Sequence, residues 1–305
     1  MKPKKICEIA GRIFSQRNYV RKQVLFFFSN YFSDEKYLKL LFRLKTGYKL
    51  NLVNPLTFNE KMQWLKLYDR KLEYSKMVDK YEVKKYVANI IGEEHIIPTL
   101  ALYDEVNEIN FDALPNQFVL KCTHNSGGLV ICTDKSKLDF REAKRKLNQS
   151  LKKNYYKYNR EWPYKNVKAR IIAEQYLEDE SGWQLKDYKI FCFNGEPKFI
   201  EVDYDRYVKH KLNVYDLDWN FMDFYMTSPN DKDVIIPKPK QLEKMLDYAR
   251  KLSAGVTFLR VDLYSIGDKI YFGELTFHPG SGMIDFHPKE YDRKLGDMLI
   301  IPNNF

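Results

Sequence analysis

The stretch FLRVDLYSIGDKIYFGELTFHPGSG, residues 258–282, decides how the rest of the chain is interpreted. Two β-prone runs flank a glycine turn, which predicts a hairpin with its turn at residues 267–269. This register sets Asp262 opposite Glu274 and Arg260 opposite Thr276. Side chains alternate between the faces of a strand. One face is therefore predicted to carry Arg260, Asp262, Glu274, Thr276 and His278, and the other Leu259, Val261, Leu263, Tyr271, Leu275 and Phe277.

The two facing carboxylates predict a cation between them, because like charges at this spacing repel each other. Hard oxygen ligands with a hydroxyl nearby suit Mg²⁺, so Asp262, Glu274 and Thr276 are predicted metal ligands. A plainer interpretation stays open, in which the face is solvated and Arg260 neutralises the acids. The loop that follows favours a functional site, because the backbone N–H groups of its glycines suit anions.

A second hairpin, FVLKCTHNSGGLVIC at residues 118–132, ends its first strand with Lys121 just before a glycine loop. The lysine ammonium and the backbone amides of a loop such as Ser126–Gly127–Gly128 can hold phosphates. The segment is not a Walker A motif, and an ordinary hairpin with a lysine that reaches to solvent is the alternative. His124 has three open interpretations: a catalytic residue, a phosphate contact or a structural hydrogen-bonding group.

The remaining elements predict an α+β fold with antiparallel sheets, because neighbouring strands are joined by hairpins and helices fall between groups of strands. No doubly wound parallel sheet is expected. The local signals are a capping box at Thr57–Glu60, a helix from Asp79 to Ile91, a second capping box at Asp139–Glu142 and a hairpin turn at Asn194–Gly195.

Taken together, these segments resemble the ATP-grasp superfamily, and within it the branch of the teichuronopeptide biosynthesis protein TupA. The resemblance covers about residues 50–300 and rests on NPLTFNEKMQWLKLYDR, DKYEVKKYV, IGEEHIIPTL, FVLKCTHNSGG, IIAEQYLED and the opening stretch. It implies an ATP-grasp fold, in which two antiparallel-rich α+β subdomains clamp ATP. The predicted division is a basic helical segment at 1–50, an N-terminal α/β subdomain at 51–115, a lid subdomain at 116–178 and a C-terminal subdomain with the magnesium site at 179–305.

The resemblance also implies a role for each residue that matches a motif of the family. Lys80 and Lys121 match the phosphate-binding lysines, and Arg260 matches an arginine that stabilises the phosphoryl intermediate. Thr276 stands where the family usually has asparagine, so the number of Mg²⁺ ions stays open. The remaining matches are adenine binding at Glu174, Gln175, Tyr176 and Leu177, ribose binding at Asp187, and acceptor contacts at His278, Gly280, Ser281 and Gly282. Arg206 is a further candidate for an acidic sugar or for ATP phosphates.

The family resemblance implies an ATP-dependent ligase that joins a carboxylate to an amine through an acyl phosphate. For the TupA branch, it implies an amide between an amino acid and a uronic acid of capsule, O-antigen or teichuronic material. A glycosyltransferase for the same polysaccharide is the alternative; its Asp-x-Asp motif could be Asp203–Asp205 or Asp216–Asp218. A phosphate-binding module without chemistry is a third interpretation.

Charge concentrates at the N-terminal end of the chain. Residues 1–49 hold twelve Lys or Arg and three Asp or Glu, whereas the net charge of all 305 residues is +10. This argues against a nucleic-acid groove in the body and indicates a basic N-terminal segment suited to an anionic surface. With the resemblance, it is consistent with the hypothesis of a lipid-linked precursor at the inner face of the membrane. The run VLFFF at 24–28 is too short to span a bilayer, and a helix docked on the body is the plainer alternative. Four cysteines without metal spacing, and no secretory signal, predict reduced thiols in a cytoplasmic protein. The oligomeric state stays open.

Overall fold

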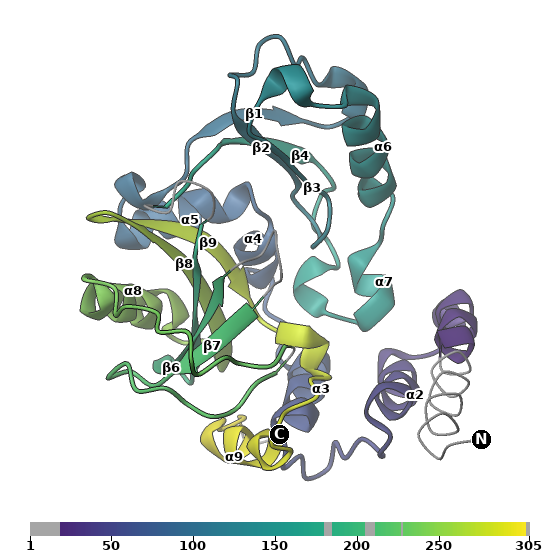
Figure 1. Ribbon diagram of the computed structural model, residues 1–305. Coiled ribbons are helices and arrows are strands. Elements are labelled where there is room, and N and C mark those ends of the chain that lie inside the picture. Colours follow the sequence, from purple (N-terminus) through teal and green to yellow (C-terminus); the bar gives the residue numbers. More distant parts are fainter. Residues whose placement is uncertain (1–18, 180–184, 205–210, 227, 303–305) are drawn as a thin grey trace, which may run out of the picture.

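The computed structural model describes residues 19–179, 185–204, 211–226 and 228–302. Its two sheets lie one above the other (Figure 1). The smaller sheet has the order β1-β4-β2-β3, and its strands are Thr99–Tyr103, Ile171–Gln175, Phe118–Cys122 and Leu129–Cys132. The larger sheet has the order β7-β6-β5-β8-β9, with strands Lys211–Tyr215, Glu196–Tyr204, Asp187–Phe193, Phe258–Ile266 and Lys269–Thr276. All of these pairings are antiparallel, which confirms the predicted α+β class.

The β8–β9 hairpin has the predicted residue pairs, but its turn is shorter than predicted and a bulge compensates for the difference. Asp262 pairs with Glu274 and Arg260 with Thr276, but the turn contains only two residues because Ile266 pairs with Lys269. A bulge at Gly273 supplies the missing offset. The bulge also reverses the alternation, so the prediction that Tyr271 joins the apolar face was wrong. Ile270 and Phe272 lie in the core instead.

Gly273 is suited to this bulge because there is no room for a side chain. A Cβ at this position would lie 3.0 Å from the Asp262 carbonyl oxygen and 3.2 Å from the Tyr264 ring. The predicted carboxylate pair therefore depends on a glycine that holds two backbones close together.

One face of the larger sheet is divided into two halves, and this division positions the site. Phe191, Phe193 and Phe258 form the aromatic half, which packs on helix α3 (Phe58–Tyr68). Further along the same strands the side chains become polar, at Asp187 and Lys189 on β5 and at Asp262 on β8. The opposite face is apolar throughout and packs on α4 (Tyr74–Val78), α5 (Glu82–Ile91) and α8 (Leu242–Ser253).

The smaller sheet buries one face against α6 (Phe140–Leu151) through Phe118, Leu120 and Leu147. Its other face carries Val119 and Lys121 on β2 and Glu174 on β4, and it looks toward the larger sheet. Two short helices, α7 (Tyr155–Asn159) and the 3-10 turn η5 (Trp162–Tyr164), connect this sheet to the lower part of the molecule.

The predicted helix signals hold with small changes. The capping box at Thr57 and Glu60 is present. Asp139 caps α6 through the Arg141 and Glu142 amides, but Glu142 pairs with Arg145 instead of closing a box, so that part of the prediction was wrong. The expected helix over 79–91 begins only at Glu82, because Asp79 accepts hydrogen bonds from the next amides and acts as a cap.

The N-terminal helices form a separate layer beside α3. They are a helical segment over residues 19–27, the turn η1 (Ser29–Tyr31) and α2 (Asp34–Thr46). Among the described residues, none of the helices has both the length and the apolar character needed to cross a bilayer. The predicted subdomain boundaries stay a prediction; β1, which precedes residue 116, joins the smaller sheet. Cys122, Cys132 and Cys192 are buried free thiols, and Cys7 lies outside the described residues.

Candidate active site

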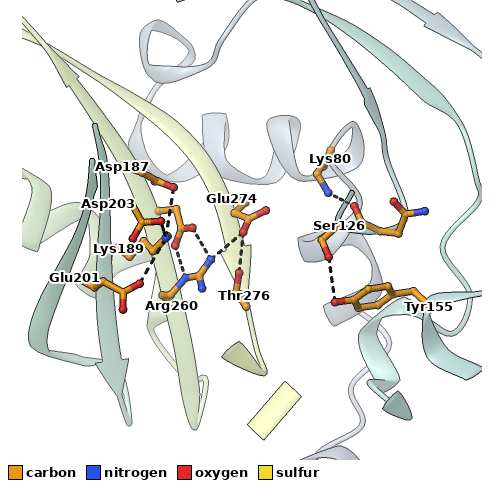
Figure 2. A network of polar contacts seen from close by, with 12 residues as sticks. Lys80, Ser126, Tyr155, Asp187, Lys189, Glu201, Asp203, Arg260, Glu274 and Thr276 are labelled. Carbon is orange, nitrogen blue, oxygen red and sulfur yellow. Dashed lines mark hydrogen bonds and ion pairs between the residues drawn. The ribbon is translucent and has the colours of Figure 1, made fainter. Parts of the chain in front are cut away.

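The centre of the site is the polar half of the larger sheet, where one arginine joins the two predicted metal ligands (Figure 2). Arg260 Nε and Nη2 donate to Asp262 Oδ1 and Oδ2 at 2.7 and 2.6 Å, and Nη2 also donates to Glu274 Oε1 at 2.9 Å. Thr276 Oγ1 donates to the same Glu274 oxygen at 3.2 Å. Asp262 and Glu274 therefore converge on one point, as the sequence predicts.

A second group of charges lies beside this arginine on β5 and β6. Lys189 is ion-paired with Asp203, with Glu201 at 3.5 Å and with Asp187 at 3.9 Å. Burial works to lower the pKa of Lys189, but Asp187 and Glu201 outweigh it and the pKa is raised. The described residues thus gather five carboxylates around two cations on one sheet face, a charge balance suited to receiving a further cation.

The carboxylates of this site suit a Mg²⁺ ion that is shared with a nucleotide. Mg²⁺ in nucleotide sites is usually held by one or two carboxylates together with substrate phosphates. The described part of the chain has no group of three or more His, Cys, Asp or Glu placed to hold a metal alone. Burial raises the pKa of Asp262 well above its ordinary value even with Arg260 beside it. The pair thus suits an ion that phosphates help to hold.

The opposite wall comes from the glycine hairpin and α7. Lys80 Nζ donates to the Asn125 carbonyl oxygen at 2.7 Å and thereby holds the hairpin loop. Ser126 Oγ donates to the Tyr155 hydroxyl at 3.3 Å, and Figure 2 shows both across from Glu274 and Thr276. Burial lowers the pKa of Lys80, although the negative charge of Glu274 opposes that shift. Gly128 must be a glycine, because a Cβ there would lie 2.5 Å from both Cys122 Sγ and Ser150 Oγ.

Lys121 is held by a buried carboxylate shared with a second lysine. Glu174 lies 2.7 Å from Lys121 Nζ and 2.5 Å from Lys84 Nζ. Burial works to raise the pKa of Glu174, but the two ammonium groups outweigh it and the pKa is lowered. Lys121 in turn has a raised pKa, because Glu174 and Glu274 outweigh its burial. The pKa of Lys84 is instead lowered, because burial outweighs the attraction of Glu174.

A mostly apolar pocket opens next to Lys121, between the two sheets. It includes the strip Gln175, Tyr176 and Leu177, where the sequence predicts adenine binding. Its other described lining residues come from both sheets and the chain between them: Ile97, Val119, Leu129, Ile131, Leu185 and Tyr264. Asp187, the predicted ribose ligand, lies at the start of β5, on the sheet that borders the pocket.

The predicted acceptor loop follows Thr276 and has an unusual backbone. Gly280, Ser281 and Gly282 all adopt left-handed φ angles of 54–57°. A Cβ at Gly282 would lie 2.2 Å from Met62 Cβ, so only glycine fits. Gln63 Nε2 donates to the Ser281 and Gly282 carbonyl oxygens at 3.1 and 2.6 Å.

Lys66 of α3 completes the support of this loop. It is fully buried, and its Nζ donates to the Ser281 carbonyl oxygen and to Ser281 Oγ, each at 2.8 Å. Burial lowers the pKa of Lys66 to about 7, against the pull of Glu161. His278, at the start of the loop, lies 3.9 Å from Glu161. His278, Gly280, Ser281 and Gly282 thus belong to one turn anchored on α3, in which Gly280 is exposed and the other three are buried.

Two predicted site residues are not brought to this centre. His124 is buried beneath the glycine hairpin, where its Nε2 contacts the Lys153 carbonyl at 3.1 Å and the Asn125 amide at 3.0 Å. These contacts match the structural interpretation, and its catalytic role stays a prediction. Arg206 lies outside the described residues.

Sequence reasoning missed Lys66, Lys84, Tyr155, Lys189 and Glu201. A signal existed for two of these residues. Lys84 follows Lys80 by about one helical turn, and Lys189 directly precedes the apolar run IFCF in a strand that is buried throughout. Lys66 carries no such signal, because a lysine on a helix ordinarily faces solvent.

The two Asp-x-Asp candidates do not form a nucleotide-sugar site in the described residues. Asp203 belongs to an antiparallel strand and pairs with Lys189, and Asp205 lies outside the described residues. Asp216 accepts the Asp218 and Asn220 amides and closes a turn. These contacts give Asp216 a structural role.

Comparison with known proteins gives the following matches. The sequence model of the TupA-like ATP-grasp family matches residues 60–300. Among solved structures, a D-alanine–D-alanine ligase from Bacillus anthracis complexed with ATP is 16% identical, with a TM-score of 0.39, over 68% of this chain and 55% of its own. This chain thus spans about half the length of that ligase.

Two further solved structures are similar. A D-alanine–D-alanine ligase from Helicobacter pylori is 16% identical, with a TM-score of 0.40, over 79% of this chain and 69% of its own. A RimK domain ATP-grasp protein from Sphaerobacter thermophilus is 10% identical, with a TM-score of 0.40, over 74% and 69%. No curated protein matches the sequence.

Proposed function

This chain belongs to the TupA-like ATP-grasp family, and on that basis we propose that it is an ATP-dependent ligase that joins a carboxylate to an amine. The observation that carries the proposal is the convergence of Asp262 and Glu274 opposite the wall that holds Lys80. A nucleoside triphosphate between these walls would have carboxylates on one side to hold its metal ion. On the other side, ammonium groups would bind its phosphates.

The residues of the chain supply charge and position to this reaction. Lys121 and Lys80 bind the phosphates, and Arg260 stabilises the phosphoryl group as it moves to the substrate carboxylate. A carboxylate oxygen attacks the terminal phosphorus, and ADP leaves. The amine then attacks the carbonyl carbon of the acyl phosphate, the C–N bond forms and phosphate leaves. Mg²⁺, when bound by Asp262 and Glu274, would neutralise charge on the phosphates.

The proposed substrates follow from the family alone. The carboxylate is that of a uronic acid in a cell-surface polysaccharide precursor, and the amine is that of an amino acid. The loop at Pro279–Gly282 follows Thr276 closely in sequence, and its two glycines bring backbone N–H groups that suit an acidic acceptor, which supports the idea that the acceptor binds there. Arg206 and His278 are the proposed further contacts to an acidic saccharide.

Trapping of the acyl phosphate tests the proposal. The full chain would be incubated with ATP, Mg²⁺, hydroxylamine and glucuronate or galacturonate, and hydroxamate and phosphate would be measured. We expect both products, and an Asp262→Asn variant should lose at least about 100-fold in rate because a metal ligand is gone. Asp268→Asn, in the exposed turn of the same hairpin, is the matched control and should keep full activity.

The result that would overturn the proposal is also specific. Turnover of a UDP-sugar without ATP would identify a glycosyltransferase instead. ATP binding without any hydroxamate, across a panel of sugar acids and amino acids, would favour a binding module.

A further inference from the structure

An aromatic and aliphatic stripe lies on the outer side of the N-terminal helices. Its five members are Val20, Val24, Phe27, Phe28 and Tyr31, hereafter the N-terminal stripe. The first three are separated by three or four residues and share one side of the helical segment, and Phe28 and Tyr31 lie in the turn that follows it. Phe27 is 75% exposed and Tyr31 83% exposed, far above what large apolar side chains usually show.

The three aromatic members of the stripe form one continuous patch. The ring centroids of Phe27 and Phe28 lie 5.1 Å apart, and those of Phe28 and Tyr31 lie 6.1 Å apart. Contiguous exposed apolar patches of this kind mark interaction sites, whereas single exposed apolar residues do not.

The helix that carries the stripe is docked on the rest of the molecule through its opposite side. Leu25, on the inner side, is buried with Tyr37 and Leu41 of α2. The Phe26 ring stacks on Tyr158 at a centroid distance of 4.0 Å. Arg160 Nη2 also donates to the Ser29 carbonyl oxygen at 2.6 Å. The inner side is thus docked, and docking fixes the stripe toward the outside.

The part of the chain that carries the stripe is rich in positive charge. Arg21 is exposed beside it, and residues 1–49 contain nine more cations than acids. Two of the three acids in this range are already paired. Asp34 is bound by Arg70 and Arg160, and Glu35 by Lys39. A basic helix with exposed aromatic rings is the composition that binds at the interface of an anionic bilayer.

We propose that the N-terminal stripe docks the protein on an anionic lipid surface. Charge complementarity favours lipid over a protein partner, because the patch combines flat aromatic rings with an excess of cations. The inner side of the same helices is in contact with the end of the acceptor loop, since Met283 packs on the Leu25–Tyr37–Leu41 cluster. Resting on the proposed function, this contact implies an acceptor presented at the membrane, such as a lipid-linked saccharide.

Vesicle flotation of the full chain tests the docking without any use of activity. The probes are vesicles of phosphatidylcholine alone and vesicles that also contain phosphatidylglycerol. We expect binding to the anionic vesicles about tenfold tighter than to the neutral ones, and a loss of binding at high salt. The double variant Phe27→Asp/Tyr31→Asp should lose about tenfold or more in binding to the anionic vesicles.

Two controls separate the stripe from general stickiness. Val53→Asp and Ile235→Asp remove side chains that are 97% and 88% exposed elsewhere, and they should bind vesicles like the unchanged protein. The double variant should melt at the same temperature, because its side chains do not fill the core. Equal flotation of all variants would overturn the proposal. So would a dimer in light scattering that the double variant abolishes, since the stripe would then bind a second copy.

Discussion

Two buried lysines mark the two ends of the site, and they are built in opposite ways. Lys189, beside the proposed metal site, is surrounded by Asp187, Glu201 and Asp203, and its pKa is raised because these carboxylates outweigh burial. Lys66, beneath the acceptor loop, has no carboxylate within ion-pair distance among the described residues. Its partners are a carbonyl, a hydroxyl and an amide oxygen, and burial lowers its pKa to about 7.

The difference shows what each end of the site does with charge. At the metal end, five carboxylates surround two cations, so a bound metal ion would reduce an excess of negative charge. At the acceptor end, the lysine uses its hydrogen bonds to hold Ser281 in a left-handed backbone that costs free energy for a non-glycine residue. One lysine balances charge, and the other shapes a loop.

Exchange of each lysine for methionine should give the largest difference between the two ends of the site. Lys189→Met leaves three neighbouring carboxylates without their shared cation, and we expect the free energy of unfolding to fall by about 3 kcal/mol or more. Lys66→Met removes an uncompensated cation, and the Ser281 carbonyl keeps its bond from Gln63, so we expect a change within about 1 kcal/mol. Urea unfolding of both variants measures the difference.

The exposed Lys76→Met on α4 gives the baseline for the same exchange. An equal loss in Lys66→Met and Lys189→Met would contradict the comparison. It would mean that Glu161 stabilises Lys66 as fully as the three carboxylates stabilise Lys189.

The pH dependence of stability should sharpen the contrast. Lys66 has a folded pKa of about 7 and an ordinary value of 10.5, so the unfolded chain holds more protons between these limits. The cost of burying the charge is therefore full below about pH 7 and fades as pH rises. We expect the free energy of unfolding of the unchanged protein, relative to Lys66→Met, to rise by up to about 1.4 kcal/mol per pH unit.

Urea unfolding at pH 7, 8 and 9 measures this slope. The groups facing Lys66 are Glu161, which raises its pKa, and Lys45, which lowers it. A slope of zero or of opposite sign would show that Lys66 stays charged in the folded protein and is stabilised by Glu161.

The metal end could be predicted from the sequence because its signals are local. Strand alternation and a short turn set Asp262 opposite Glu274, and the pairing survived an error in turn length because the bulge at Gly273 restored it. Lys66 could not be predicted in this way. Its burial depends on Ser281, 215 residues away, and within α3 a lysine has the pattern of a solvent-facing residue. Local patterns predict faces of elements, whereas contacts between distant segments decide which polar residue is buried.

Thr276 offers the smallest and most local test of the metal end. Its hydroxyl donates to Glu274 Oε1 at 3.2 Å, so it orients a residue that would hold Mg²⁺. Thr276→Ala removes that bond, and we expect Mg²⁺ to support ATP binding about tenfold less well, as is typical when a group that orients a metal ligand is lost. Thr276→Asn, which restores the residue type usual in the family, should bind Mg²⁺ at least as well as the unchanged protein. Titration of Mg²⁺ in a thermal melt with ATP measures both variants. If Thr276→Ala behaves like the unchanged protein and Thr276→Asn binds less well, the hydroxyl has no part in the metal site, and Glu274 must be oriented by Arg260 alone.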